Sequence, residues 1–173
     1  MKEIYTILLL ALIGGSLSAK TEYIITYRAE DGRYHLKAPS DWKEKKTEDP
    51  LIIEIHKGDK LNISVAKLPL EPLKTLTAEA ILNSVFESMK KRMRIRIIHP
   101  IKSSKQKGIE TSVVIFDTVD TSEEKPKVTR LVLSITKNNY DVLQVLVGCD
   151  GDLIPDGLFE AMAVANTLNL NGN

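Results

Sequence analysis

Two short apolar runs constrain the fold of this chain most strongly. Val113–Phe116 and Val145–Val147 contain no polar residue, and both lie within longer segments rich in β-branched side chains. Side chains of a strand point alternately to the two faces of a sheet, so an unbroken apolar run is typical of a strand buried on both faces. The sequence therefore predicts central strands at about Ile109–Thr118, Val128–Thr136 and Tyr140–Val147, in a sheet that is covered on both sides.

The segment Thr77–Met93 is predicted to be a helix that supplies one of these covers. Its apolar residues recur at intervals of three and four, which places them on one face of a helix opposite a polar face. A ligand groove is a second interpretation of such a stripe, but packing against a sheet is its ordinary role. The residues predicted to face inward are Ala78, Ile81, Leu82, Val85, Phe86, Met89 and Met93.

Shorter strands are predicted before this helix. Turn residues at Glu30–Gly32 and at Gly58–Asp59 separate pairs of segments that are rich in β-branched or aromatic residues. Two hairpins follow from this pattern. Their strands are Tyr23–Arg28 with Arg33–Ala38, and Leu51–His56 with Leu61–Lys67.

The chain after the helix is predicted to contain one further strand, a loop and a second helix. Arg94–His99 is strand-like, whereas the proline, glycine and serine content of Pro100–Gly108 predicts a basic loop. Asp156–Leu168 has the periodicity of an amphipathic helix. Its inward residues are predicted to be Leu158, Phe159, Met162, Ala165 and Leu168.

Residues 1–19 have the pattern of an export signal. Lys2 precedes the apolar run Ile7–Ile13, and the small residues of Gly14–Ala19 form a cleavage region. The run is short for a bilayer core of about 30 Å, which favours cleavage over a retained membrane anchor. We therefore expect an exported protein, periplasmic or extracellular, without a transmembrane span after the signal is removed.

The composition limits the number of domains, the kinds of partner and the possible disulfides. A chain of 173 residues with 43% hydrophobic and 27% charged residues is long enough for one core, and we expect a single domain over residues 20–173. The formal net charge is +1, with 24 Lys and Arg against 23 Asp and Glu, so no nucleic-acid partner is predicted. Cys149 is the only cysteine in the sequence, and it cannot form an internal disulfide.

The sequence contains no strong catalytic or metal-binding motif. Cys149 paired with a histidine is conceivable as a nucleophile, but its position after an apolar run favours a small buried side chain. His35, Glu54 and His56 would form a metal site only if their strands paired, and a polar strand face is the simpler interpretation. We therefore predict a protein that is not an enzyme, with no catalytic residue, no metal and no cofactor.

The order of these features resembles that of the PsbP/Mog-like superfamily. The resemblance rests on the turn from Pro39 to Trp42, the Lys57–Asp59 hairpin that leads into Asn62–Val65, one long helix, three long strands and a terminal helix with Phe159. It implies an α+β fold, an antiparallel β-sheet sandwiched between helices. Its members include extrinsic photosynthetic subunits, a Ran-binding nuclear factor, bacterial envelope proteins and secretion chaperones, so it implies binding or assembly rather than chemistry.

Charge is distributed unevenly along the chain. The segment from Lys90 to Lys107 has eight basic residues and no acidic one, whereas Asn138–Asn173 has five acidic residues and no Lys or Arg. Helix-end charges followed by a solvated loop would explain the basic segment, and so would a surface for a protein partner or an anionic envelope. The predicted partner-binding residues are Lys90, Lys91, Arg92, Arg94, Arg96, Lys102, Lys105 and Lys107.

Overall fold

The computed structural model describes residues 24–120 and 127–169, so the predicted export signal lies outside the described residues. Within these ranges, no helix has the length and apolar character needed to cross a membrane. The strands are β1 (Ile24–Arg28), β2 (His35–Pro39), β3 (Lys43–Glu44), β4 (Leu51–Lys57), β5 (Leu61–Leu68), β6 (Ile95–Gln106), β7 (Ile109–Asp120), β8 (Lys127–Lys137) and β9 (Val142–Asp150). The helices are α2 (Leu70–Leu73), α3 (Ala78–Lys90) and α4 (Asp156–Ala165), and a 3-10 turn spans Gly151–Leu153.

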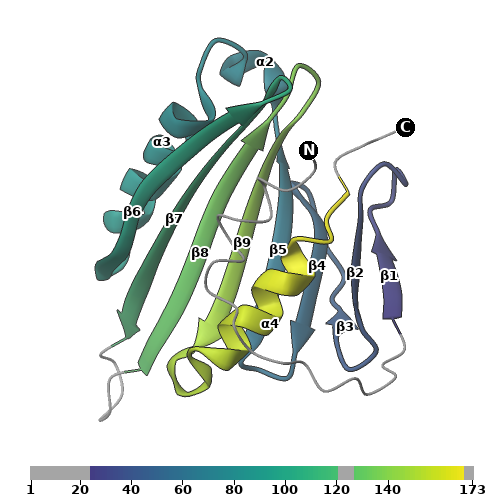
Figure 1. The fold of residues 1–173 in the computed structure, drawn as a ribbon, viewed down its shortest axis with the longest axis vertical. Coiled ribbons are helices and arrows are strands. Elements are labelled where there is room, and N and C mark those ends of the chain that lie inside the picture. Colours follow the sequence, from purple (N-terminus) through teal and green to yellow (C-terminus); the bar gives the residue numbers. More distant parts are fainter. Residues whose placement is uncertain (1–23, 121–126, 170–173) are drawn as a thin grey trace.

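Most strands join one antiparallel sheet. Its order is β3-β4-β5-β9-β8-β7-β6, while β1 and β2 form a separate antiparallel hairpin. The predicted pairing of β4 with β5 is confirmed, and the three long strands β7, β8 and β9 are neighbours as expected from their apolar runs. Figure 1 shows α3 behind the sheet, and α4 in front of it beside the hairpin. The fold is therefore α+β with a mostly antiparallel sheet.

Alternation along the central strands divides the core into two clusters. On β7, Val113 and Ile115 pack against the cluster that contains α4 and the hairpin, whereas Val114 and Phe116 belong to the cluster that contains α3. On β8, Val132 and Leu133 divide in the same way. The apolar runs thus reflect strands that contribute to both clusters, as the sequence predicts.

Helix α3 is the predicted central helix. The Thr77 hydroxyl accepts a hydrogen bond from the Ala80 backbone N–H at 3.2 Å, which caps its first turn. The Phe86 ring packs against Phe116 at a centroid separation of 4.9 Å. Met93 is the exception to the predicted face, because the helix ends at Lys90 and the Met93 side chain is 38% exposed. The fully buried residues of α3 are Ala78, Ile81, Leu82 and Phe86.

Helix α4 also begins where the sequence predicts, but its inward face differs in part. The helix ends at Ala165, and the residues that it buries are mainly small ones. Phe159 and Met162 are only partly buried. Gly157 allows the helix to approach β5 closely, because a Cβ at this position would lie 3.1 Å from the Leu61 side chain. The buried residues are Gly157, Leu158, Ala161 and Val164.

The prediction of a loop over Pro100–Gly108 is wrong, because β6 continues to Gln106. Strand β6 is at the edge of the sheet, where a proline removes no essential ladder hydrogen bond. Two register shifts, between Ile97 and His99 and between His99 and Lys102, accommodate Pro100. The turn to β7 then uses Lys107 and Gly108, both with positive φ.

We predict that Phe86→Ala lowers the free energy of unfolding by about 3–5 kcal/mol, because it removes a buried ring that packs against Phe116. Glu87→Ala on the exposed face should change it by less than about 0.5 kcal/mol. Denaturant midpoints with unchanged slopes measure both effects. Equal losses in the two variants would show that α3 does not bury the Phe86 face.

Candidate binding surface

Each helix covers only part of one face of the sheet. On one face α3 packs against β6, β7 and β8, while on the other face α4 packs against β9, β5 and the hairpin strand β2. No described helix therefore lies on the α4-side face of β6–β8, as Figure 1 shows in front of these strands. We name this region the open apolar face. Its residues on β7 and β8 are Thr111, Val113, Ile115, Val132, Ser134 and Thr136.

The other part of the sheet that no described helix covers is mostly polar. On the α3-side face of β4 and β5, the side chains that alternate with the core residues are polar. Lys45 pairs with Glu54 at 3.2 Å, and the His56 ring nitrogen Nδ1 lies 3.1 Å from the Gly58 carbonyl oxygen. Polar residues are expected where a strand faces water. On the open apolar face Val132 is buried, but Val113 and Ile115 are only partly buried, so these two require another explanation. The polar residues are Glu54, His56, Asn62 and Ser64.

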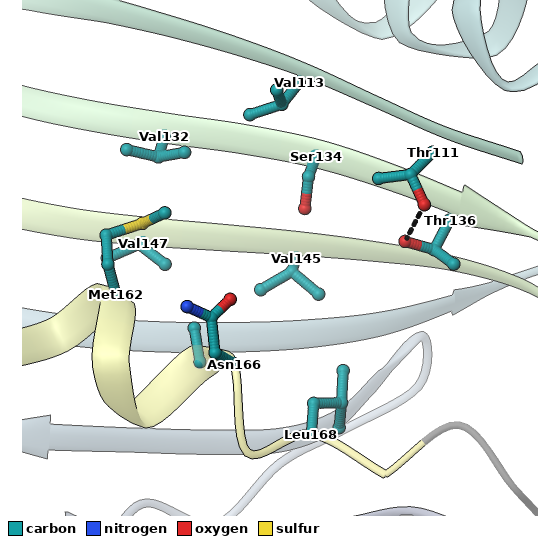
Figure 2. A pocket seen from close by; sticks show the side chains of 11 residues that line it. Thr111, Val113, Val132, Ser134, Thr136, Val145, Val147, Met162, Asn166 and Leu168 are labelled. Atoms are coloured by element: carbon teal, nitrogen blue, oxygen red, sulfur yellow. Dashed lines mark hydrogen bonds between the residues drawn. The ribbon is translucent and has the colours of Figure 1, made fainter. Parts of the chain in front are cut away.

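A hollow lies where the open apolar face meets α4. Its volume is about 260 Å³. Figure 2 shows Met162 and Asn166 extending from the α4 side toward the strand side chains, with Leu168 beside them. The Thr111 and Thr136 hydroxyls lie 3.4 Å apart, and no titratable side chain lines the described hollow. The lining residues are Thr111, Val113, Val132, Ser134, Thr136, Val145, Val147, Met162, Ala165, Asn166 and Leu168.

A buried carboxylate with two arginines borders the open apolar face. Asp117 is fully buried, and its carboxylate accepts hydrogen bonds from Arg130 Nε at 2.7 Å and Nη2 at 3.2 Å, and from Arg96 Nη2 at 2.6 Å. Burial alone would raise the pKa of Asp117, but these hydrogen bonds and the two positive charges hold that pKa below its ordinary value. Asp117 therefore remains ionised and fixes both guanidinium groups.

The arginines retain donors for a further anion. The Arg96 side chain is 68% exposed and uses one donor on Asp117, whereas Arg130 is mostly buried and uses two. Arg96, Arg130 and Asp117 together carry a net charge of +1 at this border of the open apolar face. Lys102 of β6 lies opposite Val113 of β7, and Val113 in turn lies opposite Ser134 of β8. The open apolar face thus has basic residues along its β6 side, where an acidic group could bind.

The structure separates the eight basic residues that the sequence groups together. Strand β6 has 12 residues, and at about 3.3 Å per residue its ends lie roughly 35–40 Å apart. Lys90 pairs with Glu87, Arg96 with Asp117, and Lys105 with Glu110. Lys102 lies beside the open apolar face, and Lys107 is in the β6–β7 turn. The residues near the start of β6 are Lys91, Arg92 and Arg94.

The metal and nucleophile candidates do not form a site. His35 is on the separate hairpin, whereas Glu54 and His56 are on β4, which pairs with β3 and β5. No group of three or more potential metal-binding residues occurs within residues 24–120 and 127–169. The Cys149 thiol is buried and its pKa is raised, chiefly by burial, so the reactive thiolate is disfavoured.

A second hollow, of about 320 Å³, is lined by lysines that already have partners within the chain. Lys105 pairs with Glu110, and the Lys137 ammonium donates to the carbonyl oxygens of Leu73, Lys74 and Leu76. Lys137 therefore stabilises the end of α2 rather than attracting a ligand. The open apolar face is the stronger candidate.

Sequence reasoning did not single out Asp117, Arg130 or Ser134. A signal for Asp117 was present, since a carboxylate directly after the apolar run Val113–Phe116 must be exposed or paired. Arg130 was not identifiable as its partner without the β7–β8 register. The Ser134 hydroxyl resembles any other polar side chain in an alternating strand.

Comparison with known proteins identifies the fold of this chain. No known family model and no curated protein matches the chain. Cyanobacterial PsbP (CyanoP) from Synechocystis superposes with a TM-score of 0.61 at 13% identity, covering 91% of this chain and 98% of that one. This chain has the PsbP/Mog-like fold.

Two further solved structures are similar to this chain. The Ran-binding protein Mog1p of Saccharomyces cerevisiae has a TM-score of 0.58 at 7% identity, covering 87% of this chain and 96% of that one. A protein of unknown function from Pseudomonas aeruginosa has a TM-score of 0.51 at 10% identity, covering 84% and 94%. At such identities the likeness extends to the fold alone, so the open apolar face must be argued from this chain's own residues.

We predict that Asp117→Asn lowers the free energy of unfolding by about 3 kcal/mol near neutral pH, because the mostly buried Arg130 loses its counter-charge. The folded pKa of Asp117 lies below the unfolded value of about 3.9, so this contribution is fully present above that value. It is lost as the pH falls through the folded pKa. Denaturant unfolding of both proteins across this range measures the difference. A difference that stays constant into acid would contradict the ionised Asp117.

Proposed function

We propose that this protein is an exported, non-enzymatic accessory domain that binds a protein partner through the open apolar face. The observation that carries the proposal is the contrast between the two parts of the sheet that α3 and α4, the helices described on its faces, leave uncovered. One is polar, with Glu54, His56 and Ser64, and the other has the partly buried Val113 and Ile115 and a hollow of about 260 Å³. Apolar side chains in that position favour a partner that removes them from water.

The size of the hollow favours a protein over a small molecule. Pockets for small ligands usually enclose about 300–1,000 Å³, and this hollow is smaller and opens onto the face of the sheet. Protein interfaces commonly seat one or two anchoring side chains in such a depression, with polar contacts around it. The hollow therefore suits a partner that inserts an apolar side chain between α4 and β8.

The features of edge strand β6 favour a partner that contacts the face of the sheet over one that pairs with its edge. Strand β6 has two register shifts, Pro100 and several charged side chains, all of which oppose the addition of another strand. Arg96 and Lys102 lie on the β6 side of the open apolar face. We infer a partner whose apolar contact is flanked by acidic side chains. Protein binding is compatible with this fold, since the yeast structure is described as that of a Ran-binding protein.

Export and domain organisation remain part of the proposal. The apolar run Ile7–Ile13 and the small residues Gly14–Ala19 support cleavage of a signal over residues 1–19 and a periplasmic or extracellular protein. The mature chain would be a single domain over residues 20–173, arranged as a sheet sandwiched between helices. An intact mass that retains residues 1–19 after secretion would count against the cleavage.

Cross-linking with a matched pair of variants tests the binding surface. A photoreactive residue at Thr111 in the full chain, expressed in its natural host, should cross-link the partner. Ser134→Tyr fills the hollow and should abolish that adduct, whereas Ser64→Tyr adds the same side chain to the polar face and should preserve it. Tyrosine is favourable in strands, and thermal unfolding checks that both variants fold.

The cross-linking result can also overturn the proposal. An adduct that forms equally in both tyrosine variants would show that the partner does not use the hollow. Loss of the adduct in Ser64→Tyr but not in Ser134→Tyr would place the interface on the polar face. A folded wild-type chain that gives no adduct from Thr111 would remove the open apolar face as the binding surface.

A further inference from the structure

The connection between α3 and β6 forms a distinct feature at one corner of the molecule. The backbone N–H groups of Arg92 and Met93 both donate to the Met89 carbonyl oxygen, at 2.9 and 3.1 Å, so the chain turns sharply after α3. Strand β6 begins two residues later, at Ile95. Figure 1 places this turn at the outer end of β6, on the opposite side of the sheet from the β1–β2 hairpin.

Two large apolar side chains face solvent at this turn. Met93 is 38% exposed and Ile97, the third residue of β6, is 49% exposed. Ile97 follows Ile95 by two positions and therefore points to the same face of the sheet, but α3 ends too early to cover it. We name Lys91, Arg92, Met93, Arg94 and Ile97 together the α3–β6 corner.

Three cations at the α3–β6 corner form no ion pair with the described residues. Lys91, Arg92 and Arg94 are exposed and form no ion pair there, in contrast to Lys90 with Glu87 and Arg96 with Asp117. The Val119 N–H donates to the Arg94 carbonyl oxygen at 3.2 Å, which places the end of β7 and its last residue, Asp120, nearby. With Asp120 included, the corner carries a net charge of +2, against +1 for the whole chain.

We propose that the α3–β6 corner binds the surface of an anionic lipid bilayer. Cations interleaved with exposed apolar side chains match the two parts of such a surface, its negatively charged headgroups and the apolar boundary beneath them. The corner lies at an outer end of the sheet and lines neither hollow, so a flat surface can reach it. An acidic protein face would satisfy the cations but does not account for Met93 and Ile97 beside them.

This inference is independent of the binding proposed for the open apolar face, because the two surfaces share no residue. A cation close to an anionic bilayer contributes roughly fivefold to partitioning, so the three cations together contribute about a hundredfold. The contribution should fall as salt rises, since the charges are exposed. The apolar contribution of Met93 and Ile97 should persist at high salt.

Vesicle sedimentation of the purified protein, as its host produces it, tests the proposal. The vesicles contain either phosphatidylcholine alone or an equimolar mixture with phosphatidylglycerol, and the difference between them isolates the effect of charge. The test variant is Lys91→Gln/Arg92→Gln/Arg94→Gln. The control variant Lys43→Gln/Lys46→Gln/Lys74→Gln removes the same charge from exposed positions elsewhere.

We expect the wild-type chain and the control variant to prefer the anionic vesicles, and the corner variant to lose about a hundredfold of that binding. Met93→Ser/Ile97→Ser should weaken the binding that remains at high salt, and Ser134→Tyr should leave vesicle binding unchanged. Equal losses in the corner and control variants would overturn the proposal. So would a wild-type chain that ignores the anionic vesicles, or that binds an acidic protein through the corner instead.

Discussion

Burial of both faces of the long strands is the constraint on which the rest of the structure depends. Alternate residues of β7, β8 and β9 belong to different apolar clusters, so neither face of these strands tolerates full exposure to water. Helix α3 covers one face over β6–β8, and α4 covers the other over β5 and β9. The helices are therefore offset across the sheet rather than stacked over the same strands.

This offset gives the open apolar face its significance. The offset between α3 and α4 leaves two parts of the sheet that no described helix covers, and their side chains differ. Glu54, Asn62 and Ser64 make one part polar, while the other combines the partly buried Val113 and Ile115 with the hydroxyl groups of Thr111, Ser134 and Thr136. Stability alone would be served by polar residues in both places, so the difference is best explained by a partner that covers the second part.

Burial of the Asp117 carboxylate beside Arg130 has a desolvation free-energy cost that folding does not require. A well-packed apolar group at a buried position is commonly as stable as an ion pair, or more stable. The chain instead retains a fully buried carboxylate whose hydrogen bonds orient Arg96 and Arg130 at the border of the open apolar face. Fixed guanidinium groups lose little further freedom when they bind an anion. The arrangement thus places two oriented guanidinium groups beside partly buried apolar side chains.

Local patterns in the sequence predicted the strands and helices well, since alternation and helical spacing depend on neighbouring residues. Pro100 misled the prediction of β6, because a proline is compatible with an edge strand and the edge position is set by distant pairing. Met93 continued the helical spacing beyond the point where α3 ends. The basic segment looked like one surface, and only the ion pairs of Lys90, Arg96 and Lys105 show that it is several.

The open apolar face was beyond the reach of sequence patterns for a related reason. Its existence depends on where two helices lie relative to seven strands, and no spacing along the chain encodes that offset. Val113 is indistinguishable in sequence from the buried valines Val145 and Val147. The structure is needed to show which apolar residues no described helix covers.

Methyl NMR of the protein with its cross-linked partner, once identified, tests the central claim most directly. The account predicts that the methyl signals of Val113, Val132, Val145 and Val147 shift or broaden when the partner is added, since these residues line the hollow. The methyl signals of Ile53 and Ile63, which are buried on β4 and β5, should stay in place. Perturbation confined to β4 and β5, with the four valines unchanged, would contradict the claim that the open apolar face is the binding surface.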